Sequence, residues 1–478
     1  MKKTVRLLCA LLSLLVILSP IIILATAIFA LPSQYDNSFV GILDEKREAL
    51  LNEEDDKIVV VGGSSVAFGV DSDIIEKYTE MPVINFGLYA ALGTKLMLDL
   101  SRDGIKDGDI VIIAPELDAQ TLSLYFNSEA TWQAIDGDLS MLASIAPSNY
   151  LSMLGGSWRY AKDKLGYFLS GKPDPQGVYN AKNFDENGDL VYLRANNTMK
   201  TYFDPNNMIN LSPEILSDDF ADYLNDYIAD CTARGATVYF SYCPMNRMGL
   251  KSTGEDAMAD AEAFEDYLKD KINCTFISSI GDYIYDAEYF YDTNFHLNDV
   301  GSILHSVNLT KDILLELGIP TRVDEKIPEA PKLPESDINW FGEDENAVYF
   351  EYEKTEIGTY KIVGLTQLGK SQKTLTVPQG YDGRKVTAIG PSAFEGGSVT
   401  KLVIPADTNV DTIMDGAFTG ASTLTEMWCY VLDCESILPP ASFEGTASSF
   451  KVHVPPESTY NSGYYWAHRK LTFVFDAE

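Results

Sequence analysis

The chain has 478 residues, which is enough for two or three domains with large hydrophobic cores. It carries 70 acidic and 36 basic residues, a formal charge of -34 at pH 7. A surface this acidic repels phosphate backbones, so we expect no nucleic acid among its partners and no binding of anionic polymers through bulk charge. The six cysteines are too scattered for a disulfide framework. With no CxxC pair and no histidine cluster, we expect no metal and no other cofactor.

The N-terminus combines a basic start with a long apolar run. The hexapeptide MKKTVR precedes 25 residues, Leu7 to Leu31, that are almost entirely apolar. A run of this length can cross about 30 Å of hydrocarbon, and the basic flank favours a cytoplasmic N-terminus. We therefore expect residues 1–31 to be one transmembrane helix, with the bulk of the chain outside the cytoplasm. Cleavage near Ala27 or Ala30, giving a secreted product, is the alternative.

Residues 57–72, KIVVVGGSSVAFGVDS, organise the part of the chain that follows. The β-branched run at their start is typical of a strand covered on both faces in a parallel sheet. Gly62 and Gly63, followed by two serines, predict a turn in which the backbone closely approaches another group. Asp71 or Ser72 can then cap the next helix. Ligands bind at this end of the first strand in open α/β sheets.

Strand and helix patterns alternate from residue 57 to residue 318. We predict an α/β fold, a parallel sheet flanked by helices. A polar connector, residues 32–56, precedes it and contains a predicted helix over residues 45–53. The predicted strands are 58–61, 83–86, 109–114, 237–242 and 275–278, and the predicted helices are 90–102, 213–234, 255–271 and 298–317.

An aromatic-rich interval, residues 119–212, breaks this alternation. It follows the third strand, so we expect it to form the walls of a substrate cleft at the same sheet edge as Ser65. Its rings can serve as a carbohydrate platform or simply fill a core. Asn246 and Arg247 follow the fourth strand at that edge. Arg247 is a candidate for holding an anionic or polar substrate group, with a plain surface arginine as the alternative.

Histidine is scarce, with four in the whole chain. One of them, His296, lies in the loop YDTNFHLNDVG (residues 291–301) close to Asp292. A serine nucleophile needs a base with a pKa near neutrality, and Ser65, His296 and Asp292 would supply the nucleophile, the base and the group that orients the base. His305 lies in the following helix, where we expect it to pack or to be solvated.

Three segments resemble the sequence blocks of the SGNH/GDSL hydrolases. GSSVAFG, residues 63–69, is similar to the first block, with Ser65 in the nucleophile position. NFGLYAALG, residues 85–93, resembles the second block, whose glycine amide lines the oxyanion hole; here that glycine is Gly87. DTNFHLN, residues 292–298, resembles the last block, which supplies the acid and the histidine.

Two positions depart from the pattern of that family. The third block normally offers an Asn after a strand, whereas this chain has IVIIAPELD with Glu116 near that place. A carboxylate is a poor partner for an oxyanion unless it is protonated. The acid also stands four residues before His296 rather than three, with Thr293 in the usual position.

The resemblance covers residues 57–318. The chain resembles membrane-anchored members that modify the cell envelope, including the protein that serves teichoic acid D-alanylation, more than it resembles secreted lipases. This resemblance implies the three-layer fold of SGNH and flavodoxin-like proteins. It also implies a serine esterase or acyltransferase acting on acetyl or alanyl groups of cell-envelope glycans. The amides of Ser65 and Gly87 would receive the oxyanion, with Asn246 as a further donor and Glu116 close to the substrate.

The expected partners are an envelope polysaccharide or another acylated polymer, the membrane through the N-terminal helix, and a membrane acyltransferase. Two alternatives stay open. One is a non-catalytic surface adhesin or scaffold with a degenerate SGNH domain. The other is an accessory factor that receives acyl groups from the acyltransferase.

Residues 319–338 form a proline-rich linker, and a repeat follows in residues 339–478. Phe394, Phe418 and Phe443 recur at intervals of 24 and 25 residues, which predicts units stacked as a solenoid. We expect residues 340–377 to cap one end as a β-hairpin and residues 454–475 to cap the other. The units resemble BspA-like leucine-rich repeats of bacterial surface proteins. That resemblance implies a protein or glycan ligand, and a passive spacer is the alternative.

Overall fold

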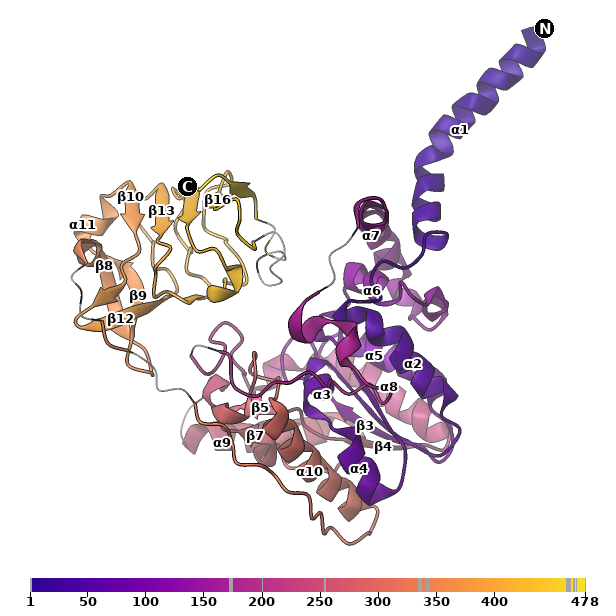
Figure 1. Cartoon of the computed structure of the whole chain (residues 1–478). Helices are drawn as coiled ribbons and strands as arrows, with labels where there is room; N and C mark the ends of the chain where they lie inside the picture. The colour runs from indigo at the N-terminus through magenta and orange to yellow at the C-terminus, as the bar shows by residue number, and fades with distance from the viewer. Residues whose placement is uncertain are drawn as a thin grey trace. The chain divides into compact units, whose positions relative to one another are not determined.

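The structure is a computed structural model that describes residues 2–171, 175–199, 201–252, 255–333, 338–340, 342, 344–460, 466, 469 and 471–477. The chain divides into two compact units (Figure 1). The N-terminal unit comprises Met1–Asp204 and Met208–Leu333, and the C-terminal unit comprises Pro205–Asn207 and Pro334–Glu478. The main boundary falls inside the linker predicted over residues 319–338.

The N-terminal unit begins with a long helix, α1 (Lys2–Phe29), over the predicted apolar run. Among the residues that the structure describes, no helix has both the length and the hydropathy needed to cross a membrane. The end of α1 packs on α7 (Tyr150–Ser170), where the Lys164 ammonium donates to the Ile28 carbonyl at 3.4 Å. The helix predicted in the connector is α2 (Leu43–Asn52).

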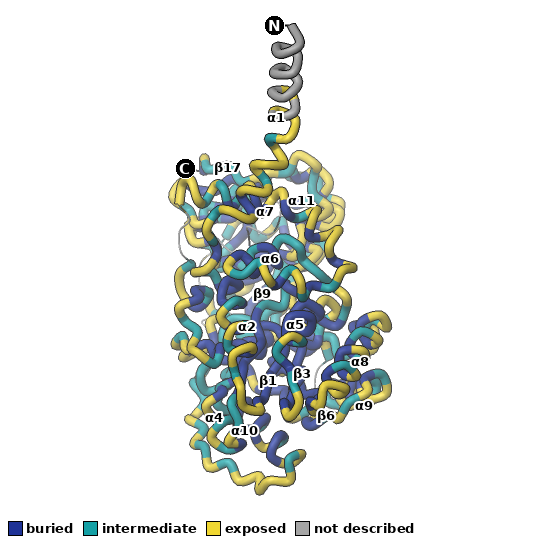
Figure 2. Tube along the Cα trace, turned by 90° about the vertical axis from the view of Figure 1, so that its right-hand side faces the viewer, coloured by how far each residue is buried: buried dark blue, intermediate teal, exposed yellow. Residues whose placement is uncertain are grey.

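A five-stranded parallel sheet forms the centre of this unit, in the order β2-β1-β3-β4-β6; its strands β3 and β4 are labelled in Figure 1. All five strands were predicted, with ends within two residues of those observed. Every residue of β1, β2 and β3 is buried, as Figure 2 shows for β1 and β3. The strands are β1 (Ile58–Gly62), β2 (Val83–Gly87), β3 (Ile110–Ala114), β4 (Thr237–Phe240) and β6 (Thr275–Phe276), and a separate pair is formed by β5 (Met245–Asn246) and β7 (Ile284–Tyr285).

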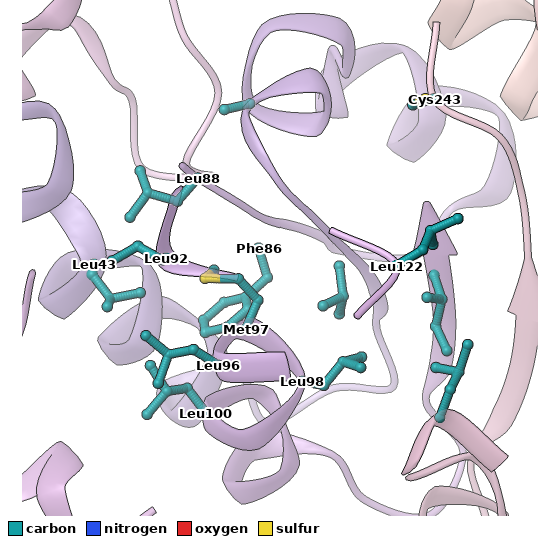
Figure 3. Packing of buried hydrophobic residues seen from close by; sticks show 14 of the residues in the cluster. Leu43, Phe86, Leu88, Leu92, Leu96, Met97, Leu98, Leu100, Leu122 and Cys243 are labelled. Carbon is teal, nitrogen blue, oxygen red and sulfur yellow. The ribbon is translucent and has the colours of Figure 1, made fainter. Parts of the chain in front are cut away.

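Alternate residues of the strands enter two different cores, because neighbouring side chains of a strand point to opposite faces. Val59 packs with residues of α5, α8 and α9 on one face, and part of this core, around Phe86 and Met97, is drawn in Figure 3. Val60 packs with residues of α4 and α10 on the other face. The predicted parallel sheet flanked by helices is therefore confirmed. The helices are α4 (Ser72–Thr79), α5 (Thr94–Ser101), α8 (Asp218–Ala233), α9 (Glu255–Lys271) and α10 (Asp299–Glu316).

The segment after β1 differs from the prediction of an open turn. Residues Ser64–Gly69 form a short helix, α3, that starts directly after Gly63. The predicted close approach does occur, because a Cβ on Gly63 would overlap the Glu116 carboxyl group. The next helix is capped by Asp71, whose side chain accepts the Ile74 N–H at 3.3 Å.

The aromatic-rich interval contains α6 (Ser128–Ala134) and α7, and then a segment without long helices that we call the strap, residues 175–199. The strap pairs with the connector through a bridge between Ser38 and Asn180. It reaches β2, where the Asn85 N–H donates to the Asn187 carbonyl at 3.0 Å. It ends at the histidine loop, where the Thr198 N–H donates to the Tyr291 carbonyl at 2.7 Å.

The C-terminal unit contains a parallel sheet in the order β10-β13-β15-β16-β17. Lys401 pairs with Glu426, and Glu426 pairs with Lys451, so three successive strands start 25 residues apart. The rings of the repeated phenylalanines stack, with centroids 5.7 Å apart for Phe394 and Phe418 and 5.0 Å apart for Phe418 and Phe443. The strands are β10 (Thr374–Thr376), β13 (Lys401–Ile404), β15 (Glu426–Cys429), β16 (Lys451–Val454) and β17 (Phe473–Phe475).

A second sheet carries the predicted hairpin cap. β8 (Phe350–Lys354) and β9 (Tyr360–Leu365) pair antiparallel, inside the range predicted for it. Of the cap expected over residues 454–475, residues 461–465, 467, 468 and 470 lie outside the described residues. The remaining elements are α11 (Gln367–Lys370), β11 (Gly380–Tyr381), β12 (Arg384–Ile389) and β14 (Thr412–Ile413).

Candidate functional site

Three of the candidate residues come from the carboxyl ends of adjacent strands. The sheet register sets Gly62 of β1 opposite both Gly87 of β2 and Ala114 of β3. Ser65 follows β1 in the first turn of α3, and Glu116 lies two residues beyond the end of β3. The parallel register therefore brings Ser65, Gly87 and Glu116 to one edge of the sheet.

Glu116 is bound to the start of α3. Its Oε1 accepts the Ser65 backbone N–H at 2.7 Å and the Ser64 hydroxyl at 3.3 Å. Burial raises the pKa of the Glu116 carboxyl, and the hydrogen bond from the Ser65 N–H opposes this only in part. Glu116 Oε2 and Ser65 Oγ are both buried and have no hydrogen-bond partner among the described residues. The hydroxyl proposed from the sequence as a nucleophile and one oxygen of the Glu116 carboxyl group therefore make no hydrogen bond within the described part of the chain.

The predicted acid and base form a direct contact. Nδ1 of His296 lies 2.7 Å from Oδ1 of Asp292, which places the proton on Nδ1 and leaves Nε2 as the base. The other carboxylate oxygen of Asp292 accepts the Tyr179 hydroxyl at 2.7 Å. Thr293 shapes the turn between them, since its Oγ1 accepts the His296 N–H at 3.0 Å. The four-residue spacing is therefore compatible with an oriented imidazole.

Phe68 connects the histidine to the helix of the serine. Its ring lies one turn after Ser65 in α3 and stacks on the His296 imidazole, with centroids 3.9 Å apart and planes 11° apart. His296 is also close enough to Glu116 to lower the pKa of that carboxyl. No hydrogen bond joins Ser65 Oγ to His296 within the described part of the chain. Phe68 therefore links the helix that carries Ser65 to the loop that carries His296, and Ser65 and His296 themselves are not hydrogen-bonded.

The three groups expected to bind an oxyanion all make hydrogen bonds inside the chain. The Ser65 N–H donates to Glu116, and the Gly87 N–H donates to Oδ1 of Asn85 at 3.1 Å. Nδ2 of Asn246 donates to the Tyr202 carbonyl at 2.9 Å. An oxyanion can therefore use the Ser65 and Gly87 N–H groups only after a local rearrangement, whereas the Asn246 amide has a second N–H.

Two other residues named from the sequence, Arg247 and His305, make contacts that fit a structural role. Arg247 is half exposed, with Nε 2.8 Å from Oδ1 of Asp286 and Nη2 donating to the Ile284 carbonyl at 3.0 Å. This conformation matches the surface-arginine alternative. His305 is buried in α10, 3.4 Å from the Tyr285 hydroxyl, and burial lowers the pKa of its imidazole to about 3. The packing role expected for His305 is confirmed.

A buried polar network lies behind the site and was not predicted. The Lys46 ammonium donates to the Asn85 carbonyl at 2.8 Å, and Asn85 Nδ2 donates to Asp189 at 2.8 Å and to the Val66 carbonyl at 3.1 Å. Burial lowers the pKa of Lys46 and raises that of Asp189. Because Asn85 also receives the Gly87 N–H, this network ties β2, α3 and the strap together.

A cavity of about 390 Å³ lies beside this network, between α2 and the strap. Four acidic side chains surround Lys46 there. None of the predicted catalytic residues lines it. The lining residues are Ile42, Glu45, Lys46, Glu48, Ala49, Asn52, Asp185, Glu186 and Gly188.

Two strap residues, Tyr179 and Arg194, lie at the site and were missed by the sequence reasoning. Tyr179 reaches Asp292, and the guanidinium carbon of Arg194 lies 5.4 Å from the centroid of the Phe68 ring. Both stand in the interval that was expected to wall a substrate cleft. No spacing or motif distinguishes them from the other polar and aromatic residues of that interval.

No family model, no curated protein and no solved structure matches the chain. Function is therefore argued from the geometry and chemistry of the residues described above.

Proposed function

We propose that this chain is a serine esterase or acyltransferase that acts on acetyl or alanyl groups of cell-envelope glycans. The observation that carries the proposal is the His296–Asp292 pair, whose imidazole stacks on Phe68 in the helix that begins at Ser64. The pair supplies an oriented base, and Ser65, which has no other hydrogen-bond partner, supplies a nucleophile from the adjoining helix; acyl transfer needs both.

The proposed reaction has two stages. Ser65 Oγ attacks the acyl carbonyl while His296 Nε2 takes its proton, and Asp292 holds the imidazole through Nδ1. The proton then passes from His296 to the departing glycan oxygen, which leaves an acyl-serine. Water or an acceptor hydroxyl, deprotonated by His296, attacks this ester and regenerates the serine. Attack by water makes the enzyme an esterase, and attack by an acceptor hydroxyl makes it a transferase.

In this scheme Glu116 replaces the Asn of the third SGNH block as a hydrogen-bond donor to the oxyanion. Its raised pKa favours the neutral acid, which can donate a hydrogen bond to an oxyanion, as an ionised carboxylate cannot. A small displacement of its side chain would also release the Ser65 N–H. One oxyanion donor contributes about 3 kcal/mol in comparable sites.

The resemblance to the SGNH/GDSL hydrolases supports the same assignment, because its blocks supply Ser65, Gly87, Asp292 and His296. For the location, we propose that α1 anchors the chain in the membrane with residues 32–478 outside the cytoplasm. The exposed apolar side chains of α1, among them Val16, Ile17 and Ile21, support this. We further propose that the C-terminal repeats, similar to BspA-like leucine-rich repeats, bind a protein or glycan of the envelope.

A second candidate is a non-catalytic surface scaffold that binds through its repeats. One observation favours it: the Ser65 and Gly87 amides are engaged inside the chain, and Ser65 Oγ is not bonded to His296. A site of this kind would keep the residues of an esterase without their activity.

Hydrolysis of an acetylated chromogenic ester by the full-length chain tests the proposal. We expect turnover that Ser65→Ala abolishes and that Ser123→Ala, a serine of the same unit outside the site, leaves unchanged. Equal rates for the wild type and Ser65→Ala would exclude a serine enzyme that uses Ser65 and would favour the non-catalytic scaffold.

A further inference from the structure

Arg194 is buried beside His296 and Asp292, and two of its nitrogens, Nε and Nη1, have no hydrogen-bond partner among the described residues. Its side chain is 5% exposed, and neither Nε nor Nη1 donates a hydrogen bond to any described residue. The guanidinium lies against Phe68, the same ring that stacks on His296. An arginine keeps its charge at all ordinary pH values, so unpaired N–H groups in the interior carry a desolvation cost.

The neighbouring acid does not complete this site. Asp299 lies 3.5 Å from Nε without a hydrogen bond, and both of its oxygens accept the backbone N–H of Arg194 at 3.1 Å. Burial lowers the pKa of the guanidinium, and the charges of Asp299 and Asp292 oppose this effect only in part. Asp299 therefore shares the charge of the guanidinium through Nε, while Nη1 keeps a buried N–H donor that no described residue uses.

We propose that Arg194 is the anion-binding residue of the site and holds a phosphate or carboxylate group of the polymer whose ester reaches Ser65. The inference rests on the proposed function and narrows its substrate to anionic envelope polymers. A guanidinium fork matches both groups, because each offers two coplanar acceptor oxygens.

The charge of the whole chain favours a local site for an anion. At -34 the surface as a whole repels a polyanion, so a single cation such as Arg194, shielded from the bulk charge, is a more favourable anchor than the surface field. Arg247, the arginine first considered for this role, already pairs with Asp286 at the surface. Because Arg194 and Ser65 are both buried, an anion reaches them only after a local rearrangement.

The test is calorimetric titration of the full-length chain in detergent with two probes, glycerol 1-phosphate and glucuronate. All variants carry Ser65→Ala, so that binding is measured without turnover. We expect at least one probe to bind. Arg194→Gln should weaken that binding about tenfold or more, and Arg194→Lys should weaken it less. The matched control Arg247→Gln should stay within about twofold of the parent.

The relative affinity for the two probes identifies phosphate or carboxylate as the preferred group. The inference is overturned if neither probe binds the parent, or if Arg194→Gln binds as tightly as the parent while retaining its far-UV circular dichroism and melting temperature. Arg194-dependent binding together with Ser65-independent hydrolysis would overturn the proposed catalysis alone, so the two failures are distinguishable.

Discussion

The base half and the nucleophile half of the site differ in how completely their hydrogen bonds are arranged for catalysis. On the base half, Asp292 orients His296 and is itself held by Tyr179. On the nucleophile half, Ser65 Oγ has no partner and the Ser65 amide is bound to Glu116. Under the proposed function, His296 is therefore already oriented in the free chain, whereas the surroundings of Ser65 must rearrange around Glu116.

The largest expected effect on kcat comes from substituting His296 or Asp292. His296→Ala removes the proton acceptor, and Asp292→Asn leaves the imidazole free to take the wrong tautomer. Each should lower kcat for an acetyl ester about a thousandfold. Steady-state kinetics checks this, with Ser123→Ala as the control. If either variant retains the wild-type kcat, the contact between His296 and Asp292 has only a structural role.

Substitution of Glu116 tests the other half of the site, the surroundings of Ser65. Glu116→Ala should lower kcat about a hundredfold, because one oxyanion donor is lost. Since the pKa of Glu116 is raised, the neutral acid persists to higher pH, and activity should fall as pH rises through that pKa. Glu116→Gln, a permanent donor, should remove this decline in the pH profile of kcat. If kcat of Glu116→Gln still falls at high pH as in the wild type, Glu116 is not the oxyanion donor.

The two buried histidines of this unit provide a second contrast, because His305 has no carboxylate partner among the described residues. Its pKa is lowered from 6.5 to about 3, so below pH 6.5 the unfolded chain binds a proton that the folded chain does not. Stability contributed by the neutral ring should therefore be lost as pH falls, by up to about 1.4 kcal/mol per pH unit.

Denaturant unfolding between pH 7 and pH 4 measures this slope. His305→Leu should reduce it, although the substitution itself changes the baseline stability. A slope identical in the wild type and His305→Leu would show that other groups control the acid sensitivity.

The smallest effect is expected for Tyr179→Phe. The hydroxyl lost from Asp292 is a single hydrogen bond to a charged group, so kcat should fall by about tenfold at most. The same substitution should ease movement of the strap, seen as faster amide hydrogen exchange in residues 175–199. Unchanged exchange there would show that Tyr179 does not fasten the strap.

The sheet could be predicted because its signals are local. The β-branched strands and the apolar period of the helices lie in continuous segments, and the boundaries agree within a few residues. The contact of Asp292 with His296 is also local, since four residues separate them. The helix α3 was missed because glycine and serine at its start are typical of turns, whereas packing of Val66 and Phe68 in the cores stabilises the helix.

The remaining features depend on contacts between distant parts of the chain. Arg194 and Tyr179 acquire their roles only when the strap is placed over the sheet edge. The engagement of Gly87 by Asn85, and of Asn246 by Tyr202, is set by packing rather than by residue type. Sequence patterns name candidate donors, but they do not reveal which donors the folded chain has already used.

The most direct test of the account is covalent labelling of Ser65 by a fluorophosphonate, followed by mass spectrometry of the full-length chain. The account predicts a single adduct on Ser65 that forms about a thousandfold more slowly in His296→Ala, because the phosphonylation also needs His296 to remove the hydroxyl proton. No adduct on Ser65, or equal labelling rates in the wild type and His296→Ala, would contradict it.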